Sequence, residues 1–180
     1  MVTFARQVHY TYAEYLSALE VSELRLEYLD GEIFAMAGGS PEHGMIAARI
    51  IQRLGATLPS GCRVMTSDVK VRIAATGLST FPDVSVVCGE LLRAASDPNA
   101  IVNPVLLVEV LSPSTADYDC GEKLRHYQQI ESLQTVLLVA HDAQRITAVR
   151  RQAGGWQASD HTDEVDLGPL GVLPVAAVYD

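Results

Sequence analysis

Apolar positions near the N-terminus follow first a helical and then a hairpin pattern. Behind Thr11, which can cap a helix, four side chains recur at helical spacing: Tyr12, Tyr15, Leu16 and Leu19. Two apolar-patterned runs, 24–29 and 32–36, then flank Asp30-Gly31, and an Asp-Gly pair in this position is a strong hairpin signal. The pattern predicts a short helix followed by a β-hairpin.

A longer helix is predicted after the hairpin. Ser40 is a suitable N-cap, and Pro41 follows at the first helical position, where its missing N–H is not needed. The expected buried stripe recurs every three or four residues: Ile46, Ile50, Ile51, Leu54 and Leu58.

The middle of the chain has strand patterns. Segments 62–74 and 82–88 are predicted strands, separated by a turn at 76–79. The run 105–111 is almost continuously apolar, which is typical of a central strand covered on both faces.

A third helix and further strands complete the pattern. Asp119 followed by Glu122 resembles a capping box and predicts a helix that runs to about Ile130. Strands are then expected at 135–140, at 145–151 and from Trp156 onward. This order predicts a mixed α/β (α+β) fold, with a central mixed sheet flanked by helices, an additional N-terminal hairpin and C-terminal strands.

Composition places the chain among globular proteins. It has 180 residues, of which 48% are hydrophobic and 19% charged, and no repeat or linker divides it, so one domain spanning 1–180 is expected. No apolar run approaches the roughly 18 residues of a membrane span, and no secretion signal is evident. We expect a soluble, cytoplasmic protein. Its three cysteines, Cys62, Cys88 and Cys120, lack CxxC spacing and predict reduced thiols rather than disulfides or a zinc site.

The net charge of −9 argues against nucleic-acid binding unless cations gather on one face or metal ions assist. The alternative is that the acidity serves solubility alone. Arg49 and Arg53 share a helix face, and the basic residues available for phosphate contacts are Arg49, Arg53, Arg63, Lys70, Arg72 and Arg125.

Two acids stand out in strand-like surroundings. Glu109 interrupts the apolar run 105–111, where a carboxylate is costly unless a partner compensates it. Asp83 follows Pro82 at the start of another strand. The structural alternatives are a salt bridge from Glu109 to a buried Arg or Lys, and a turn-capping role for Asp83. Together, two strand-borne carboxylates can converge on one Mg²⁺ or Mn²⁺ ion.

Lys123 is a third candidate. On the predicted helix it lies at the margin of the buried face, from which its side chain could extend toward the end of a neighbouring strand. The alternative is an ordinary solvated lysine.

Several motifs share one resemblance, and they lie in segments 25–32, 40–44, 81–87, 108–115 and 119–127. Pro-Asp, then Val-Glu-Val-Leu-Ser-Pro-Ser-Thr, then Asp-x-x-x-Lys-x-x-x-Tyr is a specific combination. It resembles a bacterial restriction-endonuclease-like family, long catalogued as a domain of unknown function, within the PD-(D/E)XK nuclease superfamily. The resemblance covers roughly residues 8 to 175.

The resemblance implies a restriction-endonuclease-like core. Asp83 would be the acid of the PD element and Glu109 that of the (D/E)XK element, both as metal ligands. The superfamily's usual lysine position is Leu111 here, and Lys123 matches a lysine moved to the next helix. Glu27 and His43 also match family positions and could support the site. Alternatively, Glu27 is a solvated strand residue and His43 bonds locally at a helix start.

The predicted function is a Mg²⁺- or Mn²⁺-dependent endonuclease that hydrolyses phosphodiester bonds, with DNA as partner. Asp83, Glu109 and a backbone carbonyl, that of Val110, would bind the metal, and Lys123 would orient the attacking water or stabilise the phosphorus centre. A homodimer is plausible because a duplex has two strands to cut. The rival readings are a catalytically degenerate binding or regulatory module and an acidic protein that mimics nucleic acid.

Overall fold

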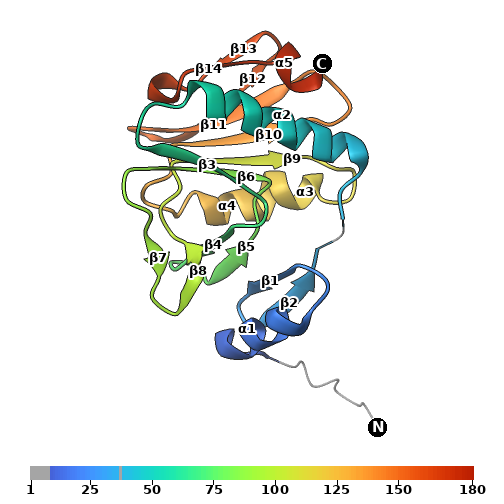
Figure 1. Ribbon diagram of the computed structural model, residues 1–180, viewed down its shortest axis with the longest axis vertical. Coiled ribbons are helices and arrows are strands. Elements are labelled where there is room, and N and C mark those ends of the chain that lie inside the picture. The colour runs from blue at the N-terminus through green and yellow to red at the C-terminus, as the bar shows by residue number, and fades with distance from the viewer. Residues whose placement is uncertain (1–8, 37) are drawn as a thin grey trace.

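A computed structural model describes residues 9–36 and 38–180 of the chain. Within these residues the strands form two six-stranded sheets and one two-stranded sheet, and the helices lie against and between the two larger sheets (Figure 1). A mixed α/β fold with a mixed sheet flanked by helices is therefore confirmed, and a second six-stranded sheet accompanies it.

The first sheet carries the larger hydrophobic core. Its order is β12-β11-β10-β9-β6-β3, and only β9 and β10 run parallel among its neighbouring strands. The strands are β3 (Cys62–Thr66), β6 (Val84–Cys88), β9 (Leu106–Val110), β10 (Thr135–Val139), β11 (Ile146–Gln152) and β12 (Gly155–His161). As predicted, β9 is buried along its whole length.

The second sheet has the order β2-β1-β5-β4-β8-β7, in which β4 and β8 are parallel. Its strands are β1 (Leu26–Leu29), β2 (Glu32–Ala35), β4 (Lys70–Ile73), β5 (Leu78–Thr80), β7 (Arg93–Ala94) and β8 (Asp97–Ile101). The predicted strand 62–74 is in fact broken by a turn, so that β3 and β4 belong to different sheets. The strands β5, β7 and β8 were not predicted, and β5 begins inside the turn that was predicted at 76–79.

Two helices begin as the sequence predicts. Thr11 caps α1 (Tyr12–Val21) in a full capping box, and Ser40 caps α2 (Pro41–Thr57). The hairpin also forms at Asp30-Gly31, where both residues have positive φ, 46° and 88°, as a type I′ turn requires.

The third helical region starts earlier than predicted. It comprises α3 (Ala116–Tyr118), a π-helical turn at Asp119–Lys123 and α4 (Leu124–Tyr127). Asp119 therefore lies inside the helical region and is not its N-cap, so the capping-box interpretation is wrong. The chain ends with β13 (Glu164–Asp166), a 3₁₀ turn (Gly168–Leu170), β14 (Val172–Pro174) and α5 (Ala176–Tyr179), which pack next to α2.

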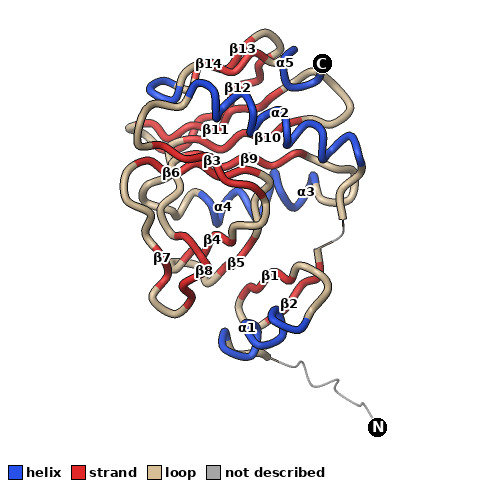
Figure 2. The backbone as a smooth tube through the Cα atoms, viewed as in Figure 1, coloured by secondary structure: helices blue, strands red, loops and turns tan. Residues whose placement is uncertain are grey.

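The helices divide between the two faces of the first sheet. One core cluster joins Ile50 of α2 and Val178 of α5 to Val108 of β9. The other joins Tyr127 of α4 to Leu107 of β9 and to Val71 of the second sheet. Figure 2 accordingly shows α3 and α4 lying between the sheets, with α2 on the far side of the first sheet.

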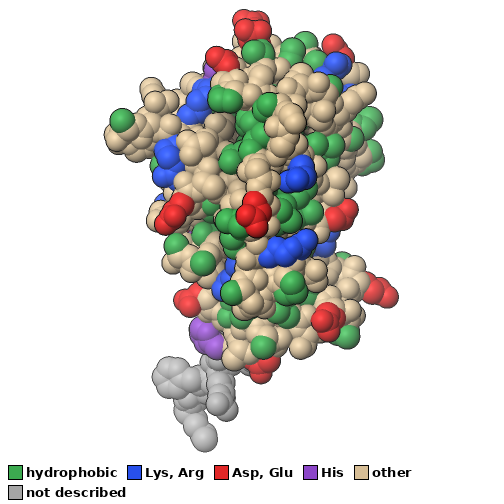
Figure 3. Space-filling model, turned by 60° about the vertical axis from the view of Figure 1, so that its left-hand side comes forward, with side chains coloured by type: hydrophobic (Ala, Val, Ile, Leu, Met, Phe, Trp, Pro, Cys, Tyr) green, Lys and Arg blue, Asp and Glu red, His purple; other side chains and the backbone are tan. Residues whose placement is uncertain are grey.

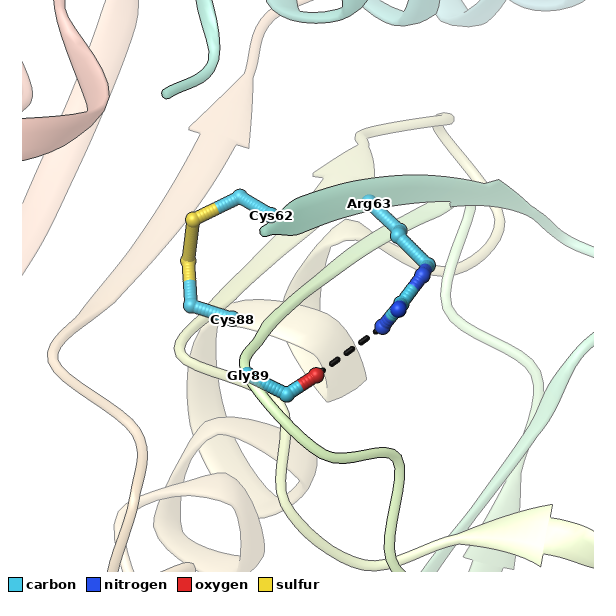
Figure 4. The surroundings of a disulfide bond; sticks show 4 residues. All are labelled: Cys62, Arg63, Cys88 and Gly89. Atoms are coloured by element: carbon cyan, nitrogen blue, oxygen red, sulfur yellow. Dashed lines mark hydrogen bonds between the residues drawn. A yellow bond between two sulfur atoms is a disulfide. The ribbon is translucent and has the colours of Figure 1, made fainter. Parts of the chain in front are cut away.

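The prediction that all three thiols are reduced is wrong for two of them. Cys62 on β3 and Cys88 on β6 are cross-strand partners in register and form a disulfide (Figure 4). Because strand register creates this pairing, the spacing of cysteines along the chain does not reveal it. Cys120 is free and exposed. In the described part of the chain, no helix is both long and apolar enough to cross a membrane.

Candidate active site

Asp83 and Glu109 lie side by side at one end of the first sheet. The antiparallel register pairs Val84 with Val108, so the next position places Asp83 opposite Glu109, and opposite residues project from the same face. The backbone N–H of Val110 also donates to Asp83 Oδ2 over 2.7 Å. Both acids line a cavity of about 970 Å³, the site cavity.

Glu109 is buried, with 4% of its surface exposed. Its Oε1 lies 3.0 Å from Lys123 Nζ and accepts a hydrogen bond from the Tyr127 hydroxyl. Burial raises the pKa of this carboxyl to about 8; Lys123 opposes the rise, and the charges of Asp83 and Asp119 add to it. The site therefore holds more carboxylate than its own lysine neutralises.

Lys123 is buried rather than solvated, with 4% of its surface exposed. Three carboxylates surround its ammonium: Glu109 at 3.0 Å, Asp119 at 3.4 Å and Glu27 at 3.7 Å. Burial alone would lower the pKa of Lys123, but Glu109 and the other neighbouring groups raise it well above its usual range. The lysine is therefore a fixed cation that is held inside the site.

The π-helical turn delivers Lys123 to this position. Such turns are rare and frequently occur at functional sites. Asp119 opens the turn and Lys123 ends it, and both are buried. Asp119 was missed as a site residue because its predicted role was that of a cap, although its spacing of four from Lys123 is the spacing of a helical ion pair.

Two residues of the second sheet reach the same cluster. Glu27 on β1 is buried, and its Oε1 accepts a hydrogen bond from Thr80 Oγ1 on β5. A solvated strand position for Glu27 is thereby excluded. Thr80 and Tyr127 were not predicted as members of the site, because their roles depend on contacts between elements distant in sequence.

His43 joins the site from the first turn of α2. Its Nε2 lies 3.2 Å from Asp83 Oδ2. The hydrogen bond to Asp83 raises the pKa of His43 above its ordinary value against the effect of partial burial, and the Val110 carbonyl and Glu109 contribute in the same direction. His43 thus makes more than a local contact at a helix start.

The predicted phosphate-binding arginines lie elsewhere. Arg49 donates to the backbone oxygens of Tyr179 and Asp180 over 3.0 and 2.6 Å. Arg53 and Arg125 are exposed, and none of the three lines the site cavity. Cations and carboxylates are interspersed over the face drawn in Figure 3, which shows no continuous basic surface.

The donor set at this strand end fits a hard divalent cation. Asp83, Glu109 and the Val110 carbonyl offer oxygen ligands, and Mg²⁺ commonly uses one or two carboxylates while it retains several waters. The described residues contain no group of three or more His, Cys, Asp or Glu arranged as a metal site. A closed cage of protein ligands, such as structural zinc requires, is therefore not present in the described part of the chain.

Comparison with known proteins gives a consistent result. The family model Uma2, described as "Putative restriction endonuclease", matches residues 12–176. The "Uncharacterized protein slr1290" of Synechocystis sp. is 38% identical over 162 residues, which cover 86% of this chain and 84% of the relative. The "Uncharacterized protein sll1609" of the same organism is 33% identical over 139 residues, covering 76% and 77%.

A solved structure shares the fold. It is a crystal structure of "a putative nuclease belonging to DUF820" from Anabaena variabilis, with a TM-score of 0.74 and 18% identity, and the match covers 92% of this chain and 96% of that one. The resemblance seen in the sequence motifs is thereby confirmed. The chain belongs to the Uma2 family, the "Putative restriction endonuclease" family.

Proposed function

We propose that this protein is a Mg²⁺- or Mn²⁺-dependent nuclease that hydrolyses phosphodiester bonds in DNA. The observation that carries the proposal is the surplus of carboxylate at the end of β9. Among the described residues, five carboxylates line the site cavity, Asp83, Glu109 and Asp119 with Glu23 and Glu42, against one lysine, Lys123, and one arginine, Arg25. A divalent cation held between Asp83 and Glu109 would offset this surplus.

In this proposal Asp83, Glu109 and the Val110 carbonyl hold the metal. Held there, a divalent ion would supply a bound water of lowered pKa and positive charge to offset that which develops on the phosphoryl group. Tyr127 fixes the orientation of Glu109 through its hydrogen bond to Oε1, and His43 together with the Val110 amide fixes Asp83. The two acids are thus held in place before any ligand arrives.

Lys123 acts on the substrate side of the same cluster. Its ammonium donates a hydrogen bond to a non-bridging phosphate oxygen or to the attacking water, and so stabilises the charge of the transition state. Asp119 and Glu27 are positioning residues, because their carboxylates hold the ammonium next to Glu109. The charge that Lys123 retains at neutral pH suits it to this role.

The decisive experiment incubates the purified chain with supercoiled plasmid and with single-stranded DNA in Mg²⁺ or Mn²⁺. The wild-type protein should cleave, and Asp83→Asn should not. Glu122→Gln is the matched control, since it removes one carboxylate from the same helical region but from an exposed side chain outside the site cavity. If wild type and Asp83→Asn are equally inert on all substrates, the enzymatic proposal fails.

A second candidate function is a non-catalytic binding module. It is favoured by the fact that Lys123 and His43 already pair with the two acids. Calorimetry with Mn²⁺ separates the two functions, because a degenerate module should give no binding signal that depends on Glu109.

Size-exclusion chromatography tests a further part of the nuclease proposal, a homodimer that supplies one site for each strand of a duplex.

A further inference from the structure

A second cavity of about 730 Å³ adjoins the site cavity. It lies beside α1, β4 and β8, and it shares four wall residues with the site cavity: Glu23, Leu24, Arg25 and Phe81. Much of its remaining wall is apolar, including Leu16, Leu19, Met65, Leu91 and Ile101. Its volume falls within the range of small-molecule sites.

A buried ion pair stands in this wall. Lys70 Nζ lies 2.6 Å from Asp97 Oδ2, and the two side chains are 5% and 3% exposed. A buried pair stabilises a fold little more than apolar residues of the same volume would, so its presence calls for another explanation. None of the residues proposed for the nuclease reaction contacts it.

The pair has hydrogen-bonding capacity left for a ligand. An ammonium carries three N–H donors, and Asp97 is the only carboxylate in ion-pair contact with Lys70 among the described residues. The Tyr12 hydroxyl donates over 2.8 Å to the same Asp97 Oδ2 that contacts Lys70, and the amide of Asn99 donates over 3.1 Å to Oδ1, which keeps acceptor capacity for a ligand. A donor and an acceptor therefore stand next to each other in fixed positions on the cavity wall.

The charges of the second cavity disfavour an anion. Its lining contains three cations, Arg25, Lys70 and Arg93, against the four carboxylates of Glu20, Glu23, Asp68 and Asp97. A phosphate group would meet no net positive charge there. A neutral planar ring with an acceptor beside a donor, such as the N7 and amino group of adenine, complements both the apolar walls and the ion pair.

We propose that the second cavity is a nucleobase subsite, which receives an unstacked base from nucleic acid bound in the site cavity. The identity of the ligand rests on the proposed nuclease function. The shared wall gives the route, because residues 23–25 and Phe81 line both this cavity and the one that holds Asp83 and Glu109. The subsite would give the enzyme a preference for one base near the cut.

Calorimetric titration of the protein with each of the four deoxynucleosides tests this inference in the absence of phosphate and metal. The wild-type protein should bind at least one of them with a Kd of about 0.1–1 mM, as expected of a small ligand fragment. Leu19→Trp, which fills the cavity from α1, should weaken binding by about tenfold or more.

The matched control is Val21→Trp. It adds the same side chain to the same helix, at a position that is 85% exposed and outside the cavity lining, and it should bind as wild type does. A double variant, Lys70→Met with Asp97→Leu, removes both charges and should abolish the preference among bases. Thermal unfolding of each variant verifies that it is folded.

Three results would overturn the subsite: no nucleoside binds, Leu19→Trp binds as well as wild type, or inorganic phosphate displaces the nucleoside. Failure here is distinguishable from failure of the proposed function. If the wild-type protein cleaves DNA but binds no nucleoside, the subsite alone is wrong. If nucleosides bind as expected but no DNA is cut under any condition, the nuclease proposal is wrong and the cavity remains a base-binding site.

Discussion

The two buried lysines of this protein, Lys123 and Lys70, are held in opposite electrostatic settings. Lys123 faces three carboxylates, and the pKa of Glu109 beside it rises to about 8 because burial is not fully compensated. Among the residues that the structure describes, Lys70 has one ion-pair partner, Asp97. Burial would raise the pKa of Asp97 too, but hydrogen bonds from Lys70 and Tyr12 hold it below its ordinary value.

In the Lys70 cluster the charges of lysine and carboxylate balance, whereas in the Lys123 cluster carboxylates outnumber the lysine. A one-to-one pair is electrically complete, and it can lose neither partner without leaving a buried charge. A cluster with surplus carboxylate is incomplete in the absence of a further cation. Substitutions in the two clusters should therefore have effects of different kinds, on stability in one and on metal-dependent chemistry in the other.

The largest effect is expected on catalysis at the unbalanced cluster. Glu109→Gln should reduce the rate of DNA cleavage by about 10³-fold, since it removes a metal ligand and with it much of the transition-state stabilisation. Initial rates on labelled DNA measure this loss. Stability without metal should change by less than about 1 kcal/mol, because the neutral side chain relieves the carboxylate surplus. A large loss of stability would mean that Glu109 is a structural ion-pair partner.

The balanced pair should show the reverse. Asp97→Asn leaves the Lys70 ammonium buried without its carboxylate, and it should lower the free energy of unfolding by about 3 kcal/mol or more. Urea denaturation followed by circular dichroism measures the difference. If Asp97→Asn is as stable as wild type, the pair of Lys70 and Asp97 does not contribute to stability as a balanced ion pair should.

Metal binding sharpens the same comparison. Mn²⁺ at a concentration 100-fold above its Kd should raise the free energy of unfolding by about 2.7 kcal/mol in the wild-type protein. Asp97→Asn should gain as much, since its defect lies in the other cluster, whereas Glu109→Gln should gain nothing. Thermal unfolding with and without Mn²⁺ gives the result, and an equal gain in Glu109→Gln would place the metal elsewhere.

The smallest effect concerns the positioning of Lys123. Asp119→Asn should lower kcat by about tenfold, or 1.4 kcal/mol, while KM and Mn²⁺ affinity stay close to wild type, because Glu27 and Glu109 still contact the ammonium. Glu122→Gln, an exposed change nearby, should leave kcat unaltered. A change in KM alone would point to a role in substrate binding rather than in positioning.

Local signals in the sequence were sufficient for the elements that are built by local interactions. The caps at Thr11 and Ser40, the Asp30-Gly31 turn and the buried strand around Glu109 all form as predicted. Each depends on residues within a few positions of one another. Glu109 is also marked by a local signal, because a carboxylate that interrupts the apolar run 105–111 indicates a candidate site residue.

Features that depend on tertiary contacts could not be predicted in this way. The Cys62–Cys88 disulfide follows from strand register, and the division of 62–74 between two sheets follows from a turn with no Gly or Pro signal. Asp119 carried a local signal in its spacing of four from Lys123, but the convergence of Glu27 and Glu109 on the same ammonium depends on β1 and β9. The metal itself and its substrate stay predictions, which the experiments above address.

One contact at the candidate site belongs to the main chain. The peptide N–H of Val110 donates to Asp83 Oδ2 over 2.7 Å and holds that carboxylate in place. No side chain can be deleted to remove such a contact, and among the natural residues proline alone lacks the N–H. The contact between Asp83 and position 110 therefore depends on the alignment of β6 with β9 and is made by the backbone of whichever non-proline residue stands there.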